Sequence, residues 1–204
     1  MFSISLVLFD MDQVLCDYDR QARCAYLAKL AATTAEAVYA AIWETGFETS
    51  ADAGAIDAQT YLRSFGERIG YPLTLDEWLE ARKASMTPRP AVLDLVRRAS
   101  GRARIAVLTN NPMLVADHID QLLPGLRPLF GDAIYASARF KAAKPGPECF
   151  RRCLHHLGAT PGNTVRRRSG RERRGCGRGW VVRSPLRLTR GPGRGASRLR
   201  SDLM

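Results

Sequence analysis

Short apolar runs alternate with helical stretches along the first 164 residues. Three runs are rich in strand formers, as in buried parallel strands, and they span residues 4–9, 104–108 and 133–137. Helices are expected where apolar residues recur at helical spacing, over residues 91–99, 113–123 and 147–157. This alternation predicts an α/β fold with a Rossmann-like parallel sheet.

A long helical stretch separates the first two strands. Residues 18–85 show apolar positions at helical spacing, and Gly46, Gly54 and Gly70 divide them. The stretch is therefore predicted to be a helical cap inserted after the first strand. The predicted division is a core of residues 1–16 and 86–164 with a cap of residues 17–85.

The last forty residues differ in composition from the rest. Residues 165–204 hold thirteen arginines, no lysine and two acidic residues, and no period of 2 or 3.6 persists among their apolar positions. Such a segment buries too little apolar surface to offset its ordering entropy, so we expect a disordered tail. The first 164 residues carry equal numbers of basic and acidic side chains. They give no electrostatic reason to expect a nucleic-acid partner.

The N-terminal apolar run is short and Asp10 interrupts it, which is not the pattern of a signal peptide. No run approaches the roughly 20 apolar residues that a membrane helix needs. We therefore expect a cytoplasmic protein without a membrane partner.

Polar side chains follow the predicted strands. Asp10 and Asp12 follow the first strand, Thr109 follows the second, and Lys144 comes later. In open α/β sheets, active groups collect at the carboxyl ends of the strands. One carboxylate can attack phosphorus while the other protonates the leaving oxygen, and a hydroxyl and an ammonium can hold the phosphoryl oxygens. A hard cation such as Mg²⁺ would bring an anionic ester to an anionic nucleophile.

The order and spacing of these residues resemble the haloacid dehalogenase (HAD)-like hydrolases over about residues 4–164. Residues 9–15 (Phe-Asp-Met-Asp-Gln-Val-Leu) match the first family motif, residues 107–110 (Val-Leu-Thr-Asn) match the second, and Lys144-Pro145 matches the third. The helical insert matches the small cap of the family. Gln13 departs from the pattern, because Gly, Asn or Asp is more usual there.

The resemblance implies a role for each matched residue. Asp10 would be the nucleophile that forms an aspartyl-phosphate, and Asp12 the general acid/base. Asp10 and Asp12 would bind Mg²⁺, the latter through its backbone carbonyl. Thr109 and the Asn110 amide would bind phosphate, and Lys144 would orient the nucleophile. The implied activity is hydrolysis of a small phosphorylated metabolite, since relatives that cleave carbon–halogen bonds generally lack the second Asp. A dehalogenase or phosphomutase of the same superfamily is the alternative enzyme.

The fourth motif of the family is missing. That motif is a strand ending in an acidic pair, which completes the Mg²⁺ site and should follow residues 158–164. The chain instead continues with the arginine-rich residues 165–180, which contain no acidic pair. The chain as written thus lacks metal carboxylates and the strand that should flank the first one, leaving an unpaired edge. We expect a poorly soluble product that is weakly active or inactive.

We hypothesise that a reading-frame slip near codon 164 causes this loss. When the codons are read one base later, those of Val165 to Arg168 permit Phe-Val-Asp-Asp. The codons of Glu172-Arg173 then permit only Asn or Ser, and those of Trp180-Val181 force Gly. The residues encoded in the shifted frame resemble the fourth motif at each position where the codons restrict the choice of residue. The rival hypothesis is a non-catalytic relative whose Arg/Gly-rich tail binds nucleic-acid phosphates.

Overall fold

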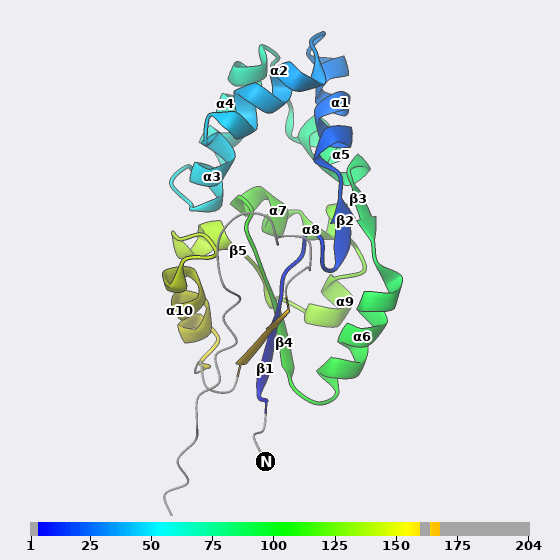
Figure 1. Ribbon diagram of the computed structural model, residues 1–204, viewed down its shortest axis with the longest axis vertical. Coiled ribbons are helices and arrows are strands. Elements are labelled where there is room, and N and C mark those ends of the chain that lie inside the picture. The colour runs from blue at the N-terminus through cyan, green and yellow to red at the C-terminus, as the bar shows by residue number, and fades with distance from the viewer. Residues whose placement is uncertain (1–3, 160–163, 168–204) are drawn as a thin grey trace, which may run out of the picture.

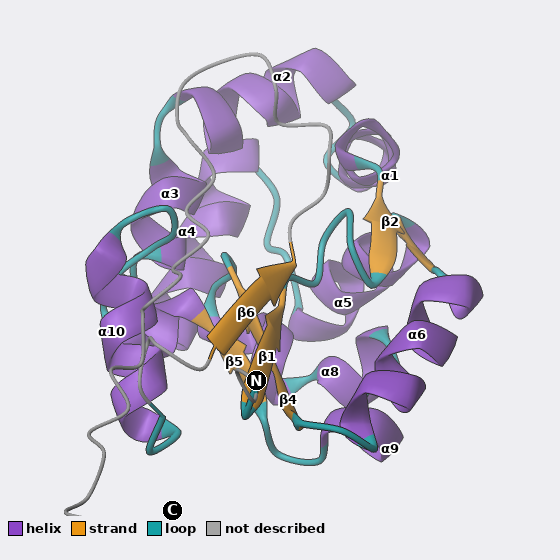
Figure 2. Cartoon of the chain, turned by 60° about the horizontal axis from the view of Figure 1, so that its bottom comes forward, coloured by secondary structure: helices purple, strands orange, loops and turns teal. Residues whose placement is uncertain are grey.

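The computed structural model describes residues 4–159 and 164–167 (Figure 1). Its core is a parallel four-stranded sheet with strand order β5-β4-β1-β6, and Figure 2 shows helices on both sides of the sheet. The prediction of an α/β fold with a parallel sheet is confirmed. The core elements are β1 (Leu6–Phe9), α6 (Pro90–Ser100), β4 (Arg104–Thr109), α7 (Met113–Asp117), α8 (Ile119–Leu122), α9 (Arg127–Phe130), β5 (Ile134–Ala136), the 3₁₀ turn η2 (Ser137–Phe140), α10 (Pro147–His156) and β6 (Thr164–Arg167).

The two faces of the sheet bury different clusters, because successive strand residues point to opposite faces. Leu8 and Leu108 pack against α10 on one face. Phe9 and Val107 join the cluster that includes α6, α8 and α9 on the other. Because both faces of the sheet are covered, the residues of β1 and β4 are apolar almost without interruption. The hydrophobic pattern of the sequence therefore reveals these two strands.

A helical cap lies above the carboxyl ends of the strands (Figure 1). Its helices begin at capping residues: Asp19, Thr34, Asp57 and Thr74 each accept a hydrogen bond from a first-turn amide. Aromatic rings fill its interior, as where Tyr61 stacks on Phe47. The cap elements are α1 (Arg20–Leu30), α2 (Ala35–Tyr39), the π-helical turn η1 (Ala40–Glu44), α3 (Phe47–Asp52), α4 (Ala58–Ile69) and α5 (Leu75–Ala84).

The cap and the core are joined by a two-stranded antiparallel ribbon that the sequence pattern does not predict. Strands β2 (Cys16–Tyr18) and β3 (Met86–Pro88) pair with Cys16 opposite Pro88. Both chain crossings between cap and core therefore run through one ribbon. Each strand has only three residues and one contains proline, so neither carries a readable alternation.

The flanking strand expected to be missing is present, which corrects the sequence-based prediction. Strand β6 pairs in parallel with β1, with Val165 opposite Val7 and Arg167 opposite Phe9. A parallel ladder is built from backbone N–H and C=O groups, so arginine-rich residues can form it. Consequently β1 has no unpaired edge, and the tail predicted from Val165 begins no earlier than residue 168. Residues 168–204, where the disordered tail is predicted, lie outside the described residues.

The far side of the cap rests on the core at η2. The Lys141 ammonium donates to the Gly54 carbonyl oxygen at 2.7 Å, and the Ser137 hydroxyl donates to the Asp52 carbonyl oxygen at 2.6 Å. Gly54 has φ 70°, and a Cβ placed on it would lie 2.2 Å from the Ala138 carbonyl oxygen. The cap is therefore docked closely at a point remote from the ribbon.

Gly54→Ala is expected to lift this side of the cap from the core. The substitution combines left-handed strain of about 1–2 kcal/mol with a backbone clash. Gly70→Ala is the matched control, because Gly70 has φ 69° but no neighbour within 4 Å of the added methyl group. Hydrogen exchange should rise at residues 50–56 in the Gly54 variant only. Equal hydrogen exchange in the two variants would show that the left-handed strain alone, without the backbone clash, determines the effect.

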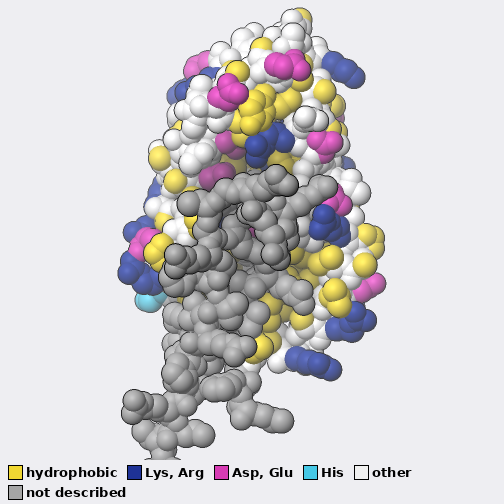
Figure 3. All heavy atoms as spheres, in the orientation of Figure 1, with side chains coloured by type: hydrophobic (Ala, Val, Ile, Leu, Met, Phe, Trp, Pro, Cys, Tyr) yellow, Lys and Arg dark blue, Asp and Glu magenta, His cyan; other side chains and the backbone are white. Residues whose placement is uncertain are grey.

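Among the described residues, no helix has the length and apolar character needed to cross a bilayer. Basic and acidic side chains are interspersed on the described part of the face in Figure 3. This agrees with the charge balance of the first 164 residues.

Candidate active site

Asp10 and Lys144 form an ion pair at the carboxyl end of the sheet. Asp10 directly follows β1, and its Oδ1 lies 2.6 Å from Lys144 Nζ. The same ammonium donates to the Leu108 carbonyl oxygen at 2.8 Å. Burial raises the pKa of Asp10 above its usual value, and the Lys144 charge opposes that rise. The site thus holds a partly desolvated carboxylate oriented by an ammonium.

The side chain of Asn110 holds the backbone of Lys144 in place. Its Oδ1 accepts from the Lys144 amide and its Nδ2 donates to the Lys144 carbonyl, both at 2.8 Å. The paired bonds join the end of β4 to the connection that precedes α10. The Asn110 side chain therefore positions Lys144. The backbone amide of Asn110 is the group predicted to bind phosphate.

Asp12 is held by two residues that sequence reasoning missed. Arg82 Nη2 lies 2.6 Å from Asp12 Oδ2 and also donates to Asn111 Oδ1 at 2.9 Å. The Asn111 amide group completes the triangle by donating to Asp12 Oδ2 at 3.3 Å. Arg82 is 3% exposed and lies over the Tyr18 ring at 4.1 Å. A cap residue thus reaches the core carboxylate.

Thr109 ends β4 with its hydroxyl inside this network. Asn111 Nδ2 donates to Thr109 Oγ1 at 2.8 Å, so the hydroxyl keeps its own proton to donate to a ligand. The Asn111 amide N–H donates to the Ser137 hydroxyl at 3.3 Å. The structure therefore brings Asp10, Asp12, Thr109 and Lys144 to one edge of the sheet, and the roles predicted for them stay predictions.

Gln13 has a left-handed backbone with φ 64°. Glycine, asparagine and aspartate tolerate this conformation best, which gives a physical reason for their more usual presence at this position. The Gln13 side chain donates to the Tyr18 carbonyl oxygen at 2.6 Å. The turn therefore forms with glutamine in place.

Asp52, at the end of α3, is a half-buried residue whose carboxyl oxygen Oδ1 is buried. Burial, and next the negative charge of Glu48, raise its pKa from 3.8 to about 8, while Arg82 and Arg23 lower it and Asp12 raises it. Its Oδ1 is buried and has no hydrogen-bond partner within the described part of the chain. Asp52 is therefore predominantly protonated in the folded protein at neutral pH.

Asp52→Asn is expected to stabilise the protein increasingly as the pH rises from about 4 to about 8. Folding at these pH values makes Asp52 take up a proton that the unfolded chain has lost. The wild type therefore loses stability as the pH rises through this window, and the amide variant does not. Urea unfolding at pH 4, 6 and 8 measures the difference. Asp57→Asn is the control, since the pKa of that exposed capping carboxyl is lowered. A difference independent of pH would contradict the assignment.

The donor set suits Mg²⁺ only in part. In the predicted roles Asp10 would supply a carboxylate oxygen and Asp12 its carbonyl, and Mg²⁺ accepts such a pair when waters and a substrate phosphate complete its shell. Within residues 4–159 and 164–167, however, no three His, Cys, Asp or Glu side chains gather as a metal-binding group. Asp10 and Asp12 alone would therefore hold Mg²⁺ weakly, and the ion, if bound, would neutralise phosphate charge.

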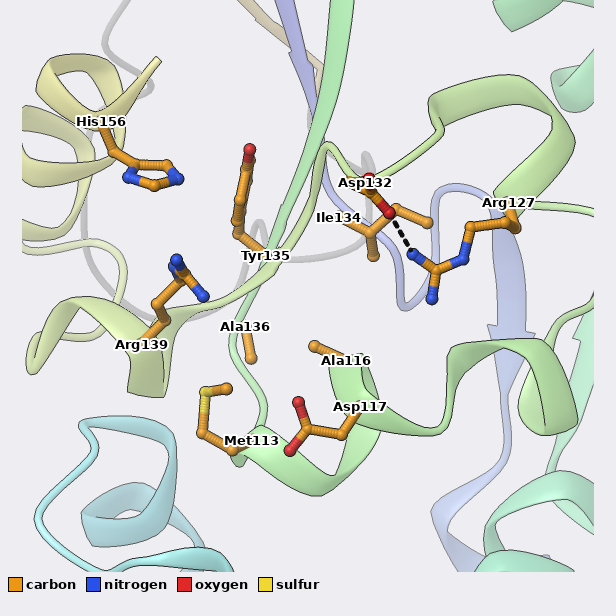
Figure 4. Close-up of a pocket in the computed structure, with 10 residues that line it drawn as sticks. All are labelled: Met113, Ala116, Asp117, Arg127, Asp132, Ile134, Tyr135, Ala136, Arg139 and His156. Carbon is orange, nitrogen blue, oxygen red and sulfur yellow. Dashed lines mark hydrogen bonds and ion pairs between the residues drawn. The ribbon is translucent and has the colours of Figure 1, made fainter.

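A pocket of about 460 Å³ lies beside the sheet edge at β5 (Figure 4). Its walls come from α7, α9, β5, η2 and α10, and it is lined by none of the predicted site residues. Arg127 is already paired with Asp132 on one side of it, and Tyr135 contacts His156 on the other. The pocket is separate from the candidate active site.

Comparisons with known proteins identify the family and the fold. The chain matches the haloacid dehalogenase-like hydrolase family over residues 4–165. No curated protein matches it. A HAD family enzyme from Bacteroides thetaiotaomicron superposes with TM-score 0.68 at 20% identity, covering 80% of this chain and 83% of that one. The same enzyme has been crystallised with magnesium and inorganic phosphate.

Two further structures have the same fold. A HAD-like family hydrolase from Porphyromonas gingivalis has TM-score 0.65 at 19% identity and covers 80% of each chain. An L-2-haloacid dehalogenase from Xanthobacter autotrophicus has TM-score 0.55 at 18% identity, covering 80% of this chain and 69% of that one. The family match spans most of the sequence and the site has the family's order of residues. The chain therefore belongs to the haloacid dehalogenase-like hydrolases.

Proposed function

We propose that this fold hydrolyses small phosphate monoesters through an aspartyl-phosphate, with turnover impaired in the present chain. The proposal rests on two carboxyl groups at one strand end. Asp10 is paired with Lys144, and Asp12 accepts hydrogen bonds from Arg82 and Asn111. Two carboxyl groups in different surroundings can divide the nucleophile and acid/base roles.

In the first step the Asp10 carboxylate attacks phosphorus and the bond to the leaving alcohol breaks. Asp12 donates a proton to the leaving oxygen, while Lys144 and the Thr109 hydroxyl hold phosphoryl oxygens. In the second step Asp12 takes the proton of a water that attacks phosphorus and frees Asp10. Mg²⁺, when bound by Asp10 and the Asp12 carbonyl, would offset the negative charge of the phosphate.

The missing acidic pair of the fourth motif supports the proposed impairment. Arg167 pairs with Phe9, one residue before Asp10, so β6 runs toward the same edge of the sheet as the nucleophile. The fourth family motif would supply its acidic pair at this point. In the present sequence this position is arginine, which offers no oxygen ligand for a cation.

Phosphate release from p-nitrophenyl phosphate with Mg²⁺ tests the proposal. We expect slow release that is lost in Asp10→Asn, because the amide is no nucleophile. Asp17→Asn is a control carboxyl change outside the site. Release that survives Asp10→Asn would refute the mechanism, and efficient turnover by the unaltered chain would refute the impairment. Chloride release from 2-chloropropionate without phosphate release would favour the dehalogenase alternative, given the Xanthobacter neighbour.

A further inference from the structure

Strand β5 is an edge of the sheet, and the pocket of about 460 Å³ lies along it. Within the described residues β5 pairs with β4 alone. The Val107 amide donates to the Ala133 carbonyl oxygen at 2.8 Å. Backbone groups of successive strand residues point to opposite sides, so the amide and carbonyl groups of Ile134 and Ala136 face away from β4. These groups form an open edge with which another strand can pair.

Elements of both helical layers line the pocket beside this edge. Helices α7 and α9 lie on one side of it, and η2 and α10 lie on the other (Figure 4). The first two contribute to the apolar cluster on one face of the sheet, and the last two to the cluster on the other face. The pocket therefore lies between the layers, where the sheet itself would continue. An extended strand is the element that fits there, and strand addition is a recurrent mode of protein recognition.

The two ends of β5 carry opposite charges. Asp132 precedes the strand and Arg139 follows it, both residues are exposed, and both line the pocket. Asp132 bonds Arg127 through Oδ1, and a carboxylate accepts at both of its oxygens. Two antiparallel copies of β5 bring Asp132 of each copy toward Arg139 of the other, whereas parallel copies bring like charges together. The edge is therefore complementary to an antiparallel second copy of itself.

One antiparallel register uses both residues that face the edge. In an antiparallel pair, residues directly opposite each other can exchange both of their backbone hydrogen bonds. Ile134 of one copy then lies opposite Ala136 of the other, and the reverse contact is identical. Such a pair has the twofold symmetry of an isologous dimer, with Tyr135 on the axis opposite its own copy.

We propose that the β5 edge is a homodimer interface, at which two copies of this chain pair antiparallel through Ile134 and Ala136 and continue the sheet. The strand is short, so side chains carry part of the contact: an aromatic pair at Tyr135 and a charge pair at each end. The candidate active site lies outside the interface, because none of its predicted residues lines the pocket.

Sedimentation equilibrium of the full chain tests this register. The unaltered chain should dimerise as its concentration is raised. Tyr135→Lys and, separately, Tyr135→Glu should each weaken the dimer by about tenfold or more, because like charges then face each other on the axis. An equimolar mixture of the two variants should associate again as a heterodimer, since the charges on the axis become opposite. Tyr39→Lys, at an exposed position of the cap, is the matched control and should dimerise like the unaltered chain.

Ala136→Pro tests the same edge without a change of charge. Ala136 has φ −77°, which suits proline, and its amide faces the open edge and not β4. The variant should keep the circular dichroism of the unaltered chain but remain monomeric. In the unaltered chain, hydrogen exchange at the Ile134 and Ala136 amides should slow as the protein concentration rises.

Several results would overturn the proposal. A full chain that stays monomeric refutes it, and so does a dimer that both Tyr135→Lys and Ala136→Pro leave intact, because the contact then lies elsewhere. Folded Tyr135 variants whose mixture does not associate contradict the twofold register. Slow exchange at Ile134 and Ala136 that is independent of concentration would mean that another strand fills the edge, which also refutes pairing between copies.

Discussion

Expressing the gene with codons from 165 onward read one base later should raise phosphate release by roughly a hundredfold or more, the scale of a preorganised charge-stabilising group. The shifted codons permit Asp at positions 167 and 168. Position 167 lies opposite Phe9, one residue before Asp10, and the resemblance to the fourth motif implies that these carboxylates would join Asp10 at the metal site. They would turn a weak Mg²⁺ site into one with more carboxylates. The measurement is p-nitrophenyl phosphate turnover and Mg²⁺ titration of both chains.

The control is the shifted chain with both new carboxyl residues changed to amides, which keeps the strand but removes the charge. It should be as slow as the present chain. A gene whose shifted codons 165–180 lack Asp-Asp, the Asn or Ser and the Gly would contradict the frame-slip hypothesis. Salt-dependent nucleic-acid binding that disappears when the chain ends at Thr164 would instead support the rival basic-tail hypothesis.

Lys144→Met should lower phosphate release in the shifted chain by about 10²–10³-fold. The ammonium is 2.6 Å from Asp10 and offsets the effect of burial, which already raises the pKa of that carboxyl. Without it, Asp10 holds its proton to higher pH and is a poorer nucleophile. The pH profile of release should therefore shift upward together with the loss of rate.

Lys29→Met, in the exposed last turn of α1, is the matched control and should leave the rate unchanged. Asn110→Ala should produce part of the Lys144 effect, since it releases the backbone that carries the ammonium. A Lys144→Met chain that keeps a tenth of the rate would contradict the role given to the ion pair.

The core could be predicted because its strands are buried on both faces. Continuous apolar runs at β1 and β4 follow from that burial, and the carboxyl-end rule then places Asp10, Asp12 and Thr109 together. The ribbon strands β2 and β3 carry no such signal. Strand β6 was not predicted, because its pairing with β1 is made by backbone groups. Its absence had been inferred from the arginine-rich side chains.

Arg82 could not be found from local sequence. It lies 70 residues from Asp12 along the chain, on a helix whose apolar spacing indicates only a cap element. Its contact with Asp12 exists only because the cap is docked on the core. Asn111 carried a weak signal, as it directly follows Thr109-Asn110 at a strand end, where polar residues gather.

The core holds the far side of the cap through main-chain oxygens, those of Asp52 and Gly54. Every amino acid offers the same oxygen, so substitutions in the cap need not disturb these two bonds. Cap sequences can then diverge while this contact between cap and core persists, provided that position 54 stays glycine. Caps of related proteins should accordingly be exchangeable as units on this core, with Ser137 and Lys141 as a general receptor for them.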